Sequence, residues 1–375
     1  MTSDKIWDRL SAPNAKTFVI AEIGKNFIQT LEERPVEEYL ANAKALVKAA
    51  FDAGADAVKF QTHNVEDEQL NINVVSPHFV GSDRYSWVSR NDKATPLDKF
   101  WRPLKAYCDQ LGIIFHSTPM SRGAAHKLNE LGVEMWKVGS GDILDFVTLD
   151  FMASTKKPII ISTGMSTLPE IDKAVDFLKK KNAKFVILHC VSKYPCPPEE
   201  LNLATIGFLR GRYGVPTGFS DHSIGFDSAL AAVALGAKVI EKHFSFSRDL
   251  WGADHKVSMT PAEMRSMTLE IRKLEKNPAA RNEHLNKDIV KKGMGEAEKV
   301  LQEGEAKFRP LFRKSLMAGR DIPAGTVITS EMVYAMRPQA YARGLASENY
   351  ELVLGKKTTK ALKKFDPISE NLLIS

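Results

Sequence analysis

The feature that most constrains the fold is a regular alternation of short apolar runs and longer helix-periodic segments over the first 245 residues. The runs are apolar throughout and rich in β-branched residues, which is typical of parallel strands buried on both faces. We expect strands at 17–24, 55–62, 112–119, 135–140, 158–164, 184–190, 215–221 and 237–244. Eight strand–helix units in succession predict a (β/α)8 TIM barrel. A doubly wound open sheet is the alternative, although no GxGxxG turn follows any of these runs.

The sequence after the barrel divides into a connecting segment and a small domain. We expect the barrel to occupy residues 1–280 and a linker to occupy 281–311, which is charged, interrupted by glycines and only weakly periodic. Short β-prone runs predict a small β-rich domain at 312–375. A domain of about sixty residues is marginally stable alone, so we expect it to pack on another surface. Residues 63–95 form an insertion that is too long for an ordinary barrel loop, and such loops are often functional.

Charge and composition limit the kinds of partner. The net charge is +6 over 375 residues, and the absence of an arginine-rich arm argues against nucleic acid as a partner. No apolar run approaches the roughly 18–20 residues that span a membrane, and the start of the chain lacks a secretory pattern. Cys108, Cys190 and Cys196 are too few for a disulfide framework and lack zinc-site spacing. We therefore expect a cytoplasmic protein whose basic surface suits a small anionic metabolite.

Polar side chains stand at nearly every predicted strand end, where the active site of a TIM barrel lies. They are Glu22, Lys59, Gln61, Ser117, Thr118, Lys137, Ser140, Ser162, Thr163, His189, Ser220, Asp221, His222, Lys242 and His243. Lys59 and Lys137, together with the hydroxyl groups, predict a site for a phosphate or a carboxylate. A Schiff-base lysine of a class I aldolase is the alternative for either of them.

Two histidines end neighbouring predicted strands. His222 and His243 follow the seventh and eighth strands, which lie about 4.8 Å apart in a barrel, so both imidazoles can reach one ion. Two nitrogens with water, carboxylate or substrate oxygens suit Mn2+, Mg2+ or a similar divalent ion. Ordinary loop histidines are the alternative. Asp254 and His255 follow in the next loop, which we interpret either as a substrate clamp or as a capped turn before a helix.

Nine short motifs occur along the chain in a fixed order. They are "AEIGKNF", "AVKFQTH", "HSTPMSR", "WKVGSGD", "ISTGMS", "LHCVSKYP", "GFSDHS", "EKHF" and "GADHKVS". In this order they resemble the sialic acid synthase family, which makes N-acetylneuraminate and related nonulosonates. The sequence from Arg313 onward is similar to the antifreeze-like (SAF) domain that ends those synthases. The resemblance covers nearly the whole chain and implies a transferase that condenses phosphoenolpyruvate with an open-chain N-acetylated hexosamine and releases phosphate.

The resemblance also implies roles for individual residues. His222 and His243 would hold a Mn2+-type ion, with Mg2+ or Co2+ as alternatives. The positions that would hold phosphoenolpyruvate are Lys59, Thr118, Lys137, Ser140, Ser162, Ser192, Tyr194 and Ser220. Glu22, Gln61 and Asp254 would lie near the sugar, with Glu22, Asp142 and Asp254 as catalytic candidates and Glu22 the candidate for proton transfer. Arg337 would reach the sugar's acyl group from the partner subunit, which implies a domain-swapped homodimer.

Three departures from the family pattern concern the sugar. Asp142 stands where many members have Glu, Ser192 stands where Asn is common, and "RPQAYARGLASENY" replaces a more glycine-rich stretch. The acceptor is therefore left open between N-acetylmannosamine and a 2,4-diacetamido-6-deoxy hexose that leads to legionaminate. The "GADHK" loop favours these over a pseudaminate-type substrate. Another phosphoenolpyruvate aldol synthase and a non-enzymatic carbohydrate- or ice-binding protein are the remaining alternatives.

Overall fold

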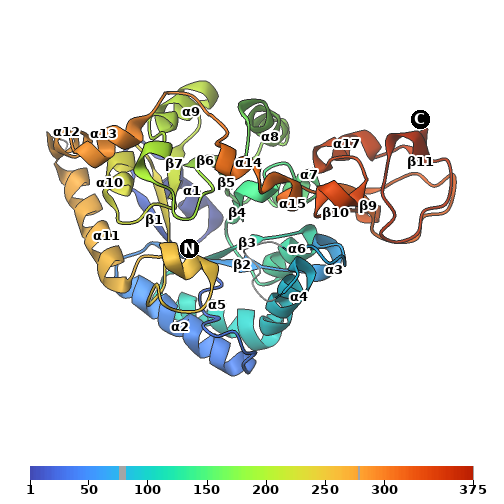
Figure 1. Cartoon of the computed structure of the whole chain (residues 1–375), viewed down its shortest axis with the longest axis horizontal. Helices are drawn as coiled ribbons and strands as arrows, with labels where there is room; N and C mark the ends of the chain where they lie inside the picture. Colours follow the sequence, from blue (N-terminus) through green and yellow to red (C-terminus); the bar gives the residue numbers. More distant parts are fainter. Residues whose placement is uncertain (76–81, 278, 375) are drawn as a thin grey trace.

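Eight parallel strands form a nearly closed barrel, which confirms the predicted fold class (Figure 1). The computed structural model describes residues 1–75, 82–277 and 279–374. The strands are β1 (Phe18–Gly24), β2 (Ala57–Thr62), β3 (Ile114–Pro119), β4 (Trp136–Val138), β5 (Ile159–Ser162), β6 (Phe185–Cys190), β7 (Thr217–Asp221) and β8 (Val239–His243). Their order is β3-β2-β1-β8-β7-β6-β5-β4, and each paired neighbour is parallel. β3 and β4 are neighbours, but within the described residues no hydrogen-bonded ladder joins them. We call this gap between β3 and β4 the barrel seam.

Each barrel strand is followed along the chain by an outer helix. These helices are α2 (Val36–Asp52), α5 (Arg102–Leu111), α6 (Arg122–Glu130), α7 (Phe146–Ser154), α8 (Leu168–Lys180), α9 (Thr205–Tyr213), α10 (Asp227–Ala234) and α11 (Pro261–Lys276). Capping boxes at Thr167 and Thr260 begin α8 and α11, and left-handed Gly112 and Gly214 end α5 and α9. No helix in the described part of the chain is long and apolar enough to cross a membrane.

A short N-terminal helix, α1 (Ser3–Ser11), covers the amino ends of the strands. Its Ile6 and Leu10 are fully buried in a cluster with residues from the starts of several strands, including Phe18 and Val239. The burial of these two side chains, four positions apart on one helix face, explains why α1 stays on the barrel. The floor of the barrel is therefore closed by the chain's own N-terminal segment.

The insertion at 63–95 forms part of the contact with the small domain. It contains α3 (Val65–Glu68) and α4 (Arg84–Ala94), while its residues 76–81 lie outside the described residues; a π-helical turn, η2 (Leu97–Trp101), follows. The backbone N–H of Arg337 donates to the Glu68 carbonyl at 2.9 Å, and the N–H of Leu70 donates to the Arg337 carbonyl at 2.9 Å. The end of α3 thus pairs with the small domain.

The segment expected to be a linker is instead ordered against the barrel. It forms α12 (Ala279–Leu285), α13 (Asp288–Met294), α14 (Glu303–Ala306) and α15 (Arg309–Phe312). The N–H groups of Leu203 and Ala204 each donate at 2.9 Å to carbonyls at the end of α13, and Lys299 and Glu305 are buried. These helices are only four to seven residues long, which is too short for a helical period to be read in the sequence.

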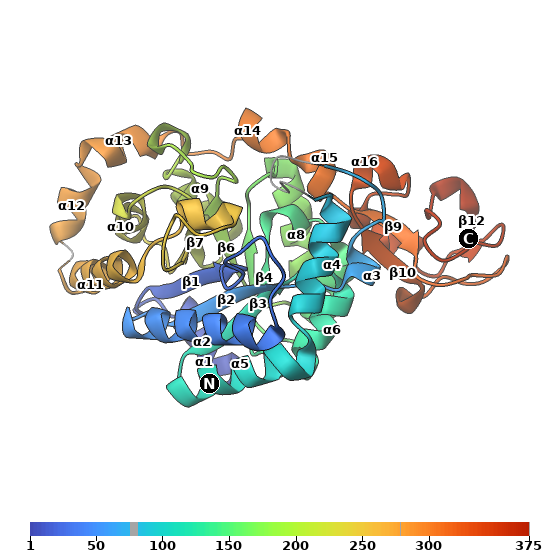
Figure 2. The ribbon, with the colours of Figure 1, turned by 60° about the horizontal axis from the view of Figure 1, so that its bottom comes forward.

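The small domain has two short antiparallel strand pairs. β9 (Ser315–Ala318) pairs with β10 (Val333–Met336), and β11 (Lys357–Thr358) pairs with β12 (Leu373–Ile374); the last residue, Ser375, is outside the described part of the predicted 312–375 domain. Two further helices, α16 (Gln339–Ala342) and α17 (Tyr350–Val353), complete it. Its place beside the barrel is visible in Figures 1 and 2.

Lys314, at the start of the small domain, connects both sides of the barrel seam. Its Nζ donates to the Met120 carbonyl after β3 at 2.6 Å and lies 2.7 Å from Asp145 Oδ2 after β4. Nearby, the Arg122 guanidinium of α6 donates to the carbonyls of Ser330 and Val333 at 2.7 and 2.9 Å. The domain therefore packs on its own barrel, at the place where the barrel lacks a ladder.

Candidate active site

A pocket of about 260 Å3 opens at the carboxyl ends of the strands, and all eight strands contribute to its lining. Every residue that the family resemblance assigns to the site lines it: Glu22, Lys59, Gln61, Thr118, Lys137, Ser140, Asp142, Ser162, Ser192, Tyr194, Ser220, His222, His243, Asp254 and Arg337. The structure brings these residues into one cavity, while their individual roles stay predictions.

Five other polar residues at strand ends do not line the pocket. They are Ser117, Thr163, His189, Asp221 and Lys242. Successive side chains of a strand point to opposite faces, so each of these points away from the barrel axis while a neighbour points inward. Lys242 Nζ lies 3.0 Å from Asp221 Oδ2 in a fully buried ion pair, and it also donates to the Ser223 and Gly225 carbonyls. This pair holds the loop after β7 in place.

The inner part of the pocket contains two buried lysines. Lys59 Nζ lies 2.8 Å from Glu22 Oε2 and 3.9 Å from Glu241 Oε1. Lys137 Nζ donates to Ser162 Oγ at 2.6 Å and lies 3.7 Å from Glu241 Oε1. Burial acts to lower the pKa of Lys59, but Glu22 and Glu241 outweigh it and raise that pKa. Lys59 is therefore held as an ammonium group, a suitable contact for an anion.

The two carboxylates around Lys59 differ in their ionisation. Burial raises the pKa of Glu22 to about 7, although Lys59 favours its charged form. Burial acts in the same direction on Glu241, but there Lys137 and Lys59 together lower the pKa to about 2. Near neutral pH, Glu241 is therefore ionised while Glu22 can hold or release a proton. Glu241 was not among the predicted residues, although strand alternation puts it on the same face as His243.

Serine hydroxyls surround the lysines. Ser220 Oγ donates to Glu241 Oε1 at 3.0 Å. A side chain at Gly164 would collide with the hydroxyl oxygens of Ser192 and Ser140, so the absence of a Cβ there lets both approach. The backbone of Ser192 is held from the segment before the small domain, because its N–H donates to Glu305 Oε1 at 2.7 Å. Several neutral donors beside two ammonium groups can bind a phosphate.

His222 and His243 lie side by side, with ring centroids 5.4 Å apart. His222 Nδ1 is 2.8 Å from the Val191 carbonyl, which can only accept, so Nδ1 carries a proton. Although burial acts to lower the pKa of His222, Cys190, the Val191 carbonyl and Asp221 outweigh burial and raise that pKa, so Nε2 offers its lone pair in the neutral form of the ring. Burial lowers the pKa of His243 to about 4, so this ring is neutral, and its buried Nδ1 has no hydrogen-bond partner in the described part of the chain. The ring of Tyr194 stacks on His222 with centroids 4.0 Å apart.

Two neighbouring imidazoles fit a divalent metal ion through the lone pairs of their neutral forms. Within residues 1–75, 82–277 and 279–374, no cluster of three or more His, Cys, Asp or Glu is arranged to hold a metal. An ion at this pair would therefore need water or substrate oxygens as its further ligands.

Arg337 lines the pocket of its own chain. Its supply by a partner subunit, which the family resemblance implies, stays a prediction. It forms a buried ion pair with Asp142, whose Oδ1 also lies 3.0 Å from Lys314 Nζ. The backbone pairing with α3 brings it to this position. The contribution from a second subunit is thus not required to complete the lining.

The outer part of the pocket has residues that the sequence reasoning did not assign. They are Lys25, His63, Arg84, Trp87 and Trp251. Burial lowers the pKa of Lys25 to about 8. The rings of Trp87 and Trp251 lie 5.6 Å apart between centroids. Lys25 and His63 belong to the quoted motifs "AEIGKNF" and "AVKFQTH", so a signal for them existed, whereas Trp87 lies in the insertion outside any motif.

The barrel, the small domain at its mouth and the charged pocket define an enzyme of the TIM-barrel class. The chain belongs to the NeuB family, whose model matches residues 46–282, and the SAF domain model matches residues 313–374. The family predicted from the sequence is therefore confirmed.

Named relatives cover nearly the whole chain. The N,N'-diacetyllegionaminic acid synthase of Campylobacter jejuni is 34% identical over 95% of this chain and 99% of its own length. The N-acetylneuraminate-9-phosphate synthase of Homo sapiens is 30% identical over 95% of this chain and 92% of its own. The crystal structure of the spore coat polysaccharide biosynthesis protein spsE from Bacillus subtilis superposes with a TM-score of 0.75 at 29% identity, covering 97% of both chains.

Proposed function

We propose that the protein condenses phosphoenolpyruvate with an open-chain N-acetylated hexosamine to give a nonulosonic acid and phosphate. The observation that carries this proposal is the pair of buried lysines, Lys59 and Lys137, among serine and threonine hydroxyls at the inner end of the pocket. Such a site suits a small substrate with both a phosphate and a carboxylate. Synthases of legionaminic acid and of N-acetylneuraminate 9-phosphate among the relatives support the same reaction class.

The reaction makes one carbon–carbon bond and breaks one carbon–oxygen bond. The methylene carbon of phosphoenolpyruvate attacks the sugar aldehyde, water adds to the adjacent carbon, and phosphate leaves with the oxygen that joined it to that carbon. Lys59 and Lys137 would hold the anionic groups, and the hydroxyls of Thr118, Ser140, Ser162, Ser192 and Ser220 would direct them. The Glu22 carboxylate would accept the proton of the attacking water, because its pKa of about 7 suits proton transfer near neutral pH.

His222 and His243 would hold a divalent ion, Mn2+ in the first place, with Mg2+ and Co2+ as alternatives. Such an ion would supply Lewis-acid polarisation of the aldehyde oxygen. The chain's own contribution is to fix the two rings: the Val191 carbonyl sets the proton on His222 Nδ1, and the Tyr194 ring stacks on the same imidazole.

For the acceptor we propose N-acetylmannosamine or a 2,4-diacetamido-6-deoxy hexose. Gln61, Asp142, Asp254 and Arg337 would contact this sugar, and Trp87 with Trp251 gives the outer pocket an apolar wall. A pseudaminate-type acceptor is the alternative. We also infer a cytoplasmic location, since the three cysteines are buried and free.

The proposal is tested by release of inorganic phosphate from phosphoenolpyruvate with a panel of sugars: N-acetylmannosamine, the 2,4-diacetamido-6-deoxy hexose of the legionaminate branch, and its pseudaminate-branch isomer. We expect release with one of the first two and none without sugar. A chelator, His222→Ala or His243→Ala should each lower the rate by about a thousandfold, the size of a Lewis-acid contribution of several kcal/mol.

Three results would contradict parts of the proposal. Absence of phosphate release with every sugar would refute the condensation. Full activity after chelation and in both histidine variants would refute the metal. Borohydride trapping of substrate on Lys59 or Lys137 would instead identify a Schiff-base enzyme. The raised pKa of Lys59 opposes this outcome for Lys59, whereas burial lowers the pKa of Lys137.

A further inference from the structure

His63 directly follows Thr62, the last residue of β2, and lines the pocket. Lys59, Gln61 and His63 follow one another at every second position and all line the pocket. Because alternate residues of a strand share a face, His63 lies one step farther from the inner lysines than Gln61 does. The charged groups that act on the His63 ring are Glu68, Lys25 and Arg84, none of which belongs to the inner cluster of Glu22, Lys59, Lys137 and Glu241. His63 therefore belongs to the outer pocket.

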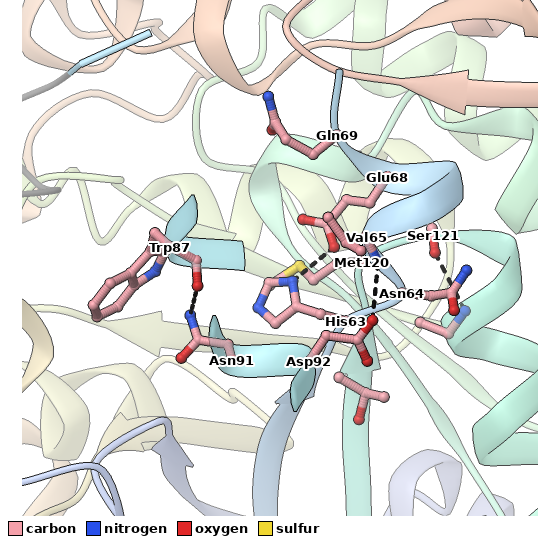
Figure 3. Close-up of polar contacts among 12 residues, drawn as sticks. His63, Asn64, Val65, Glu68, Gln69, Trp87, Asn91, Asp92, Met120 and Ser121 are labelled. Atoms are coloured by element: carbon pink, nitrogen blue, oxygen red, sulfur yellow. Dashed lines mark hydrogen bonds and ion pairs between the residues drawn. The ribbon is translucent and has the colours of Figure 1, made fainter. Parts of the chain in front are cut away.

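Glu68 fixes which nitrogen of His63 carries the proton. Its Oε2 lies 2.6 Å from His63 Nδ1, and both side chains are buried (Figure 3). Burial acts to raise the pKa of Glu68. The neighbouring His63, Arg337 and Arg84 outweigh burial and lower this pKa to about 2, so the group is a carboxylate and can only accept a hydrogen bond. Burial lowers the pKa of His63, which keeps the ring neutral. Nδ1 therefore holds the proton, and Nε2 holds a lone pair.

The lone pair of His63 Nε2 has no hydrogen-bond partner in the described part of the chain, although the atom is buried. In Figure 3 this nitrogen points away from Glu68, toward the side of the view on which Trp87 lies. Buried polar atoms are nearly always paired, so an unpaired one in a pocket wall indicates a ligand group.

Donors are numerous in the outer pocket and acceptors are few, with Asp254 as the other carboxylate assigned to the sugar. Lys25, Arg84 and Arg337 can only donate hydrogen bonds. Asp142 is engaged by Arg337 and Lys314, and Glu68 is engaged by His63. An N-acetylated hexosamine carries several hydroxyl groups and an amide N–H, each of which needs an acceptor when it is buried.

We propose that His63 Nε2 is a substrate-binding acceptor that takes a hydrogen bond from an N–H or O–H group of the acceptor sugar, with Glu68 holding the ring in the required tautomer. This inference rests on the proposed function and names one contact that selects the sugar. The competing explanation is structural: the pair only holds α3, whose Glu68 carbonyl accepts from the Arg337 N–H.

Two substitutions separate these explanations, because Asn and Gln each reproduce one side of the imidazole. In His63→Asn the amide nitrogen can replace Nδ1 and keep the bond to Glu68, but the group at Nε2 is lost. In His63→Gln the terminal amide reaches the Nε2 position with an acceptor oxygen, but the bond to Glu68 is lost. Both variants, and the unchanged protein, are assayed by phosphate release with N-acetylmannosamine and the 2,4-diacetamido-6-deoxy hexose.

With the sugar that the unchanged protein uses, we expect His63→Asn to raise the KM for the sugar about tenfold and to leave the KM for phosphoenolpyruvate unchanged. His63→Gln should keep the sugar KM within about threefold while lowering the melting temperature, since it loses the contact to Glu68. A purely structural role predicts the reverse order, with His63→Asn near normal and His63→Gln impaired, and would overturn the inference.

Nuclear magnetic resonance of protein labelled with 15N-histidine gives a second readout that does not need turnover. The His63 signals, assigned by their loss in His63→Asn, should show a protonated Nδ1 and an unprotonated Nε2 whose resonance shifts when the sugar is added. A protonated Nε2, or no shift at saturating sugar, would refute the contact. If the unchanged protein releases no phosphate with any sugar, the proposed function fails; if it is active and the sugar KM is unaffected in His63→Asn, only the inference fails.

Discussion

Glu22 and Glu241 show how neighbouring carboxylates acquire different chemistry from their surroundings. Both are buried and both lie within 3.9 Å of the Lys59 ammonium group. Glu241 has a second cation, Lys137, at 3.7 Å, whereas Glu22 has the neutral amide of Gln61 at 3.1 Å. The extra positive charge offsets the cost of burying Glu241 as an anion, and Glu22 lacks that offset. Glu22 is therefore the group that can exchange a proton near neutral pH.

Replacing Glu22 by Gln tests this assignment. Because its pKa is about 7, Glu22 is protonated below and ionised above that value, and a base is active in the ionised form. We expect kcat/KM of the unchanged protein to rise through about pH 7. Glu22→Gln should lower kcat/KM by about 100- to 10,000-fold and remove the rise. A pH profile measured by phosphate release checks both, and a rise that persists in Glu22→Gln would reject Glu22 as the base.

At the residue scale, most of the prediction of the site depended on the alternation of side chains along the strands. The alternation of side chains identifies the inward positions once the strand ends are known, which is why Lys59, Lys137 and His243 could be placed in one cavity. Glu241 lies on the same face and could have been found by the same rule. Ionisation could not be predicted, because it depends on which charges meet across the barrel. The orientation of His63 likewise depends on Glu68, five positions along the chain on α3.

At the scale of elements, α14 has a structural role that its four residues do not reveal in the sequence. Glu305 is fully buried, and its Oε1 accepts from the N–H of Met165 at 2.8 Å and of Ser192 at 2.7 Å. These two residues belong to the loops after β5 and β6, both of which line the pocket. A carboxylate from outside the barrel thus holds two loops that carry the predicted phosphoenolpyruvate contacts.

Glu305→Ala should therefore weaken both the fold and the site. Two buried N–H groups would lose their acceptor and Lys299, 3.9 Å away, would lose its counter-charge, at a cost of about 3 kcal/mol in the free energy of unfolding. The KM for phosphoenolpyruvate should rise as well. The matched control is Glu303→Ala on the same helix, whose side chain is 91% exposed and which should change stability by less than about 0.5 kcal/mol. Denaturant unfolding of both variants measures this, and equal stabilities would contradict the role of Glu305.

The barrel helices and strands could be predicted at this scale, but the 281–311 segment could not. A run of four to seven residues spans at most two helical turns, and its stability comes from the surface on which it packs. The contact of α13 with the backbone at Leu203 and Ala204 involves carbonyl and N–H groups, which leave no trace in the sequence.

At the scale of the whole molecule, the small domain supplies Arg337 to the barrel of its own chain. A swapped homodimer would make the same contacts between two copies of the chain. The two arrangements differ in whether Arg337 comes from the chain that contributes the barrel or from its partner. Mixed oligomers of Lys137→Ala and Arg337→Ala chains distinguish them. In the arrangement described here every site in the mixture lacks one group, so we expect no recovery of phosphate release.

The opposite outcome of this experiment is a partial recovery of activity, which exchange of the small domain between chains would produce. If the arginine acts between chains, each mixed dimer contains one site with both Lys137 and Arg337, and co-expression with two affinity tags would yield dimers with up to half of the unchanged activity. Recovery of that size would establish domain exchange. A single sequence does not predict which of the two chains supplies Arg337 to a given barrel, because both arrangements make the same residue contacts.

The helix α1 has a consequence for the order of events in the proposed reaction. Because it covers the amino ends of the strands, the described pocket opens at the other end of the barrel, where the small domain also lies. The lysines lie at the inner end of this pocket, and the groups assigned to the sugar lie nearer its mouth. A sugar bound first would therefore obstruct the route to the inner site, so we expect phosphoenolpyruvate to bind before the sugar. The same geometry would make the acceptor, at high concentration, an inhibitor of the free enzyme that competes with phosphoenolpyruvate.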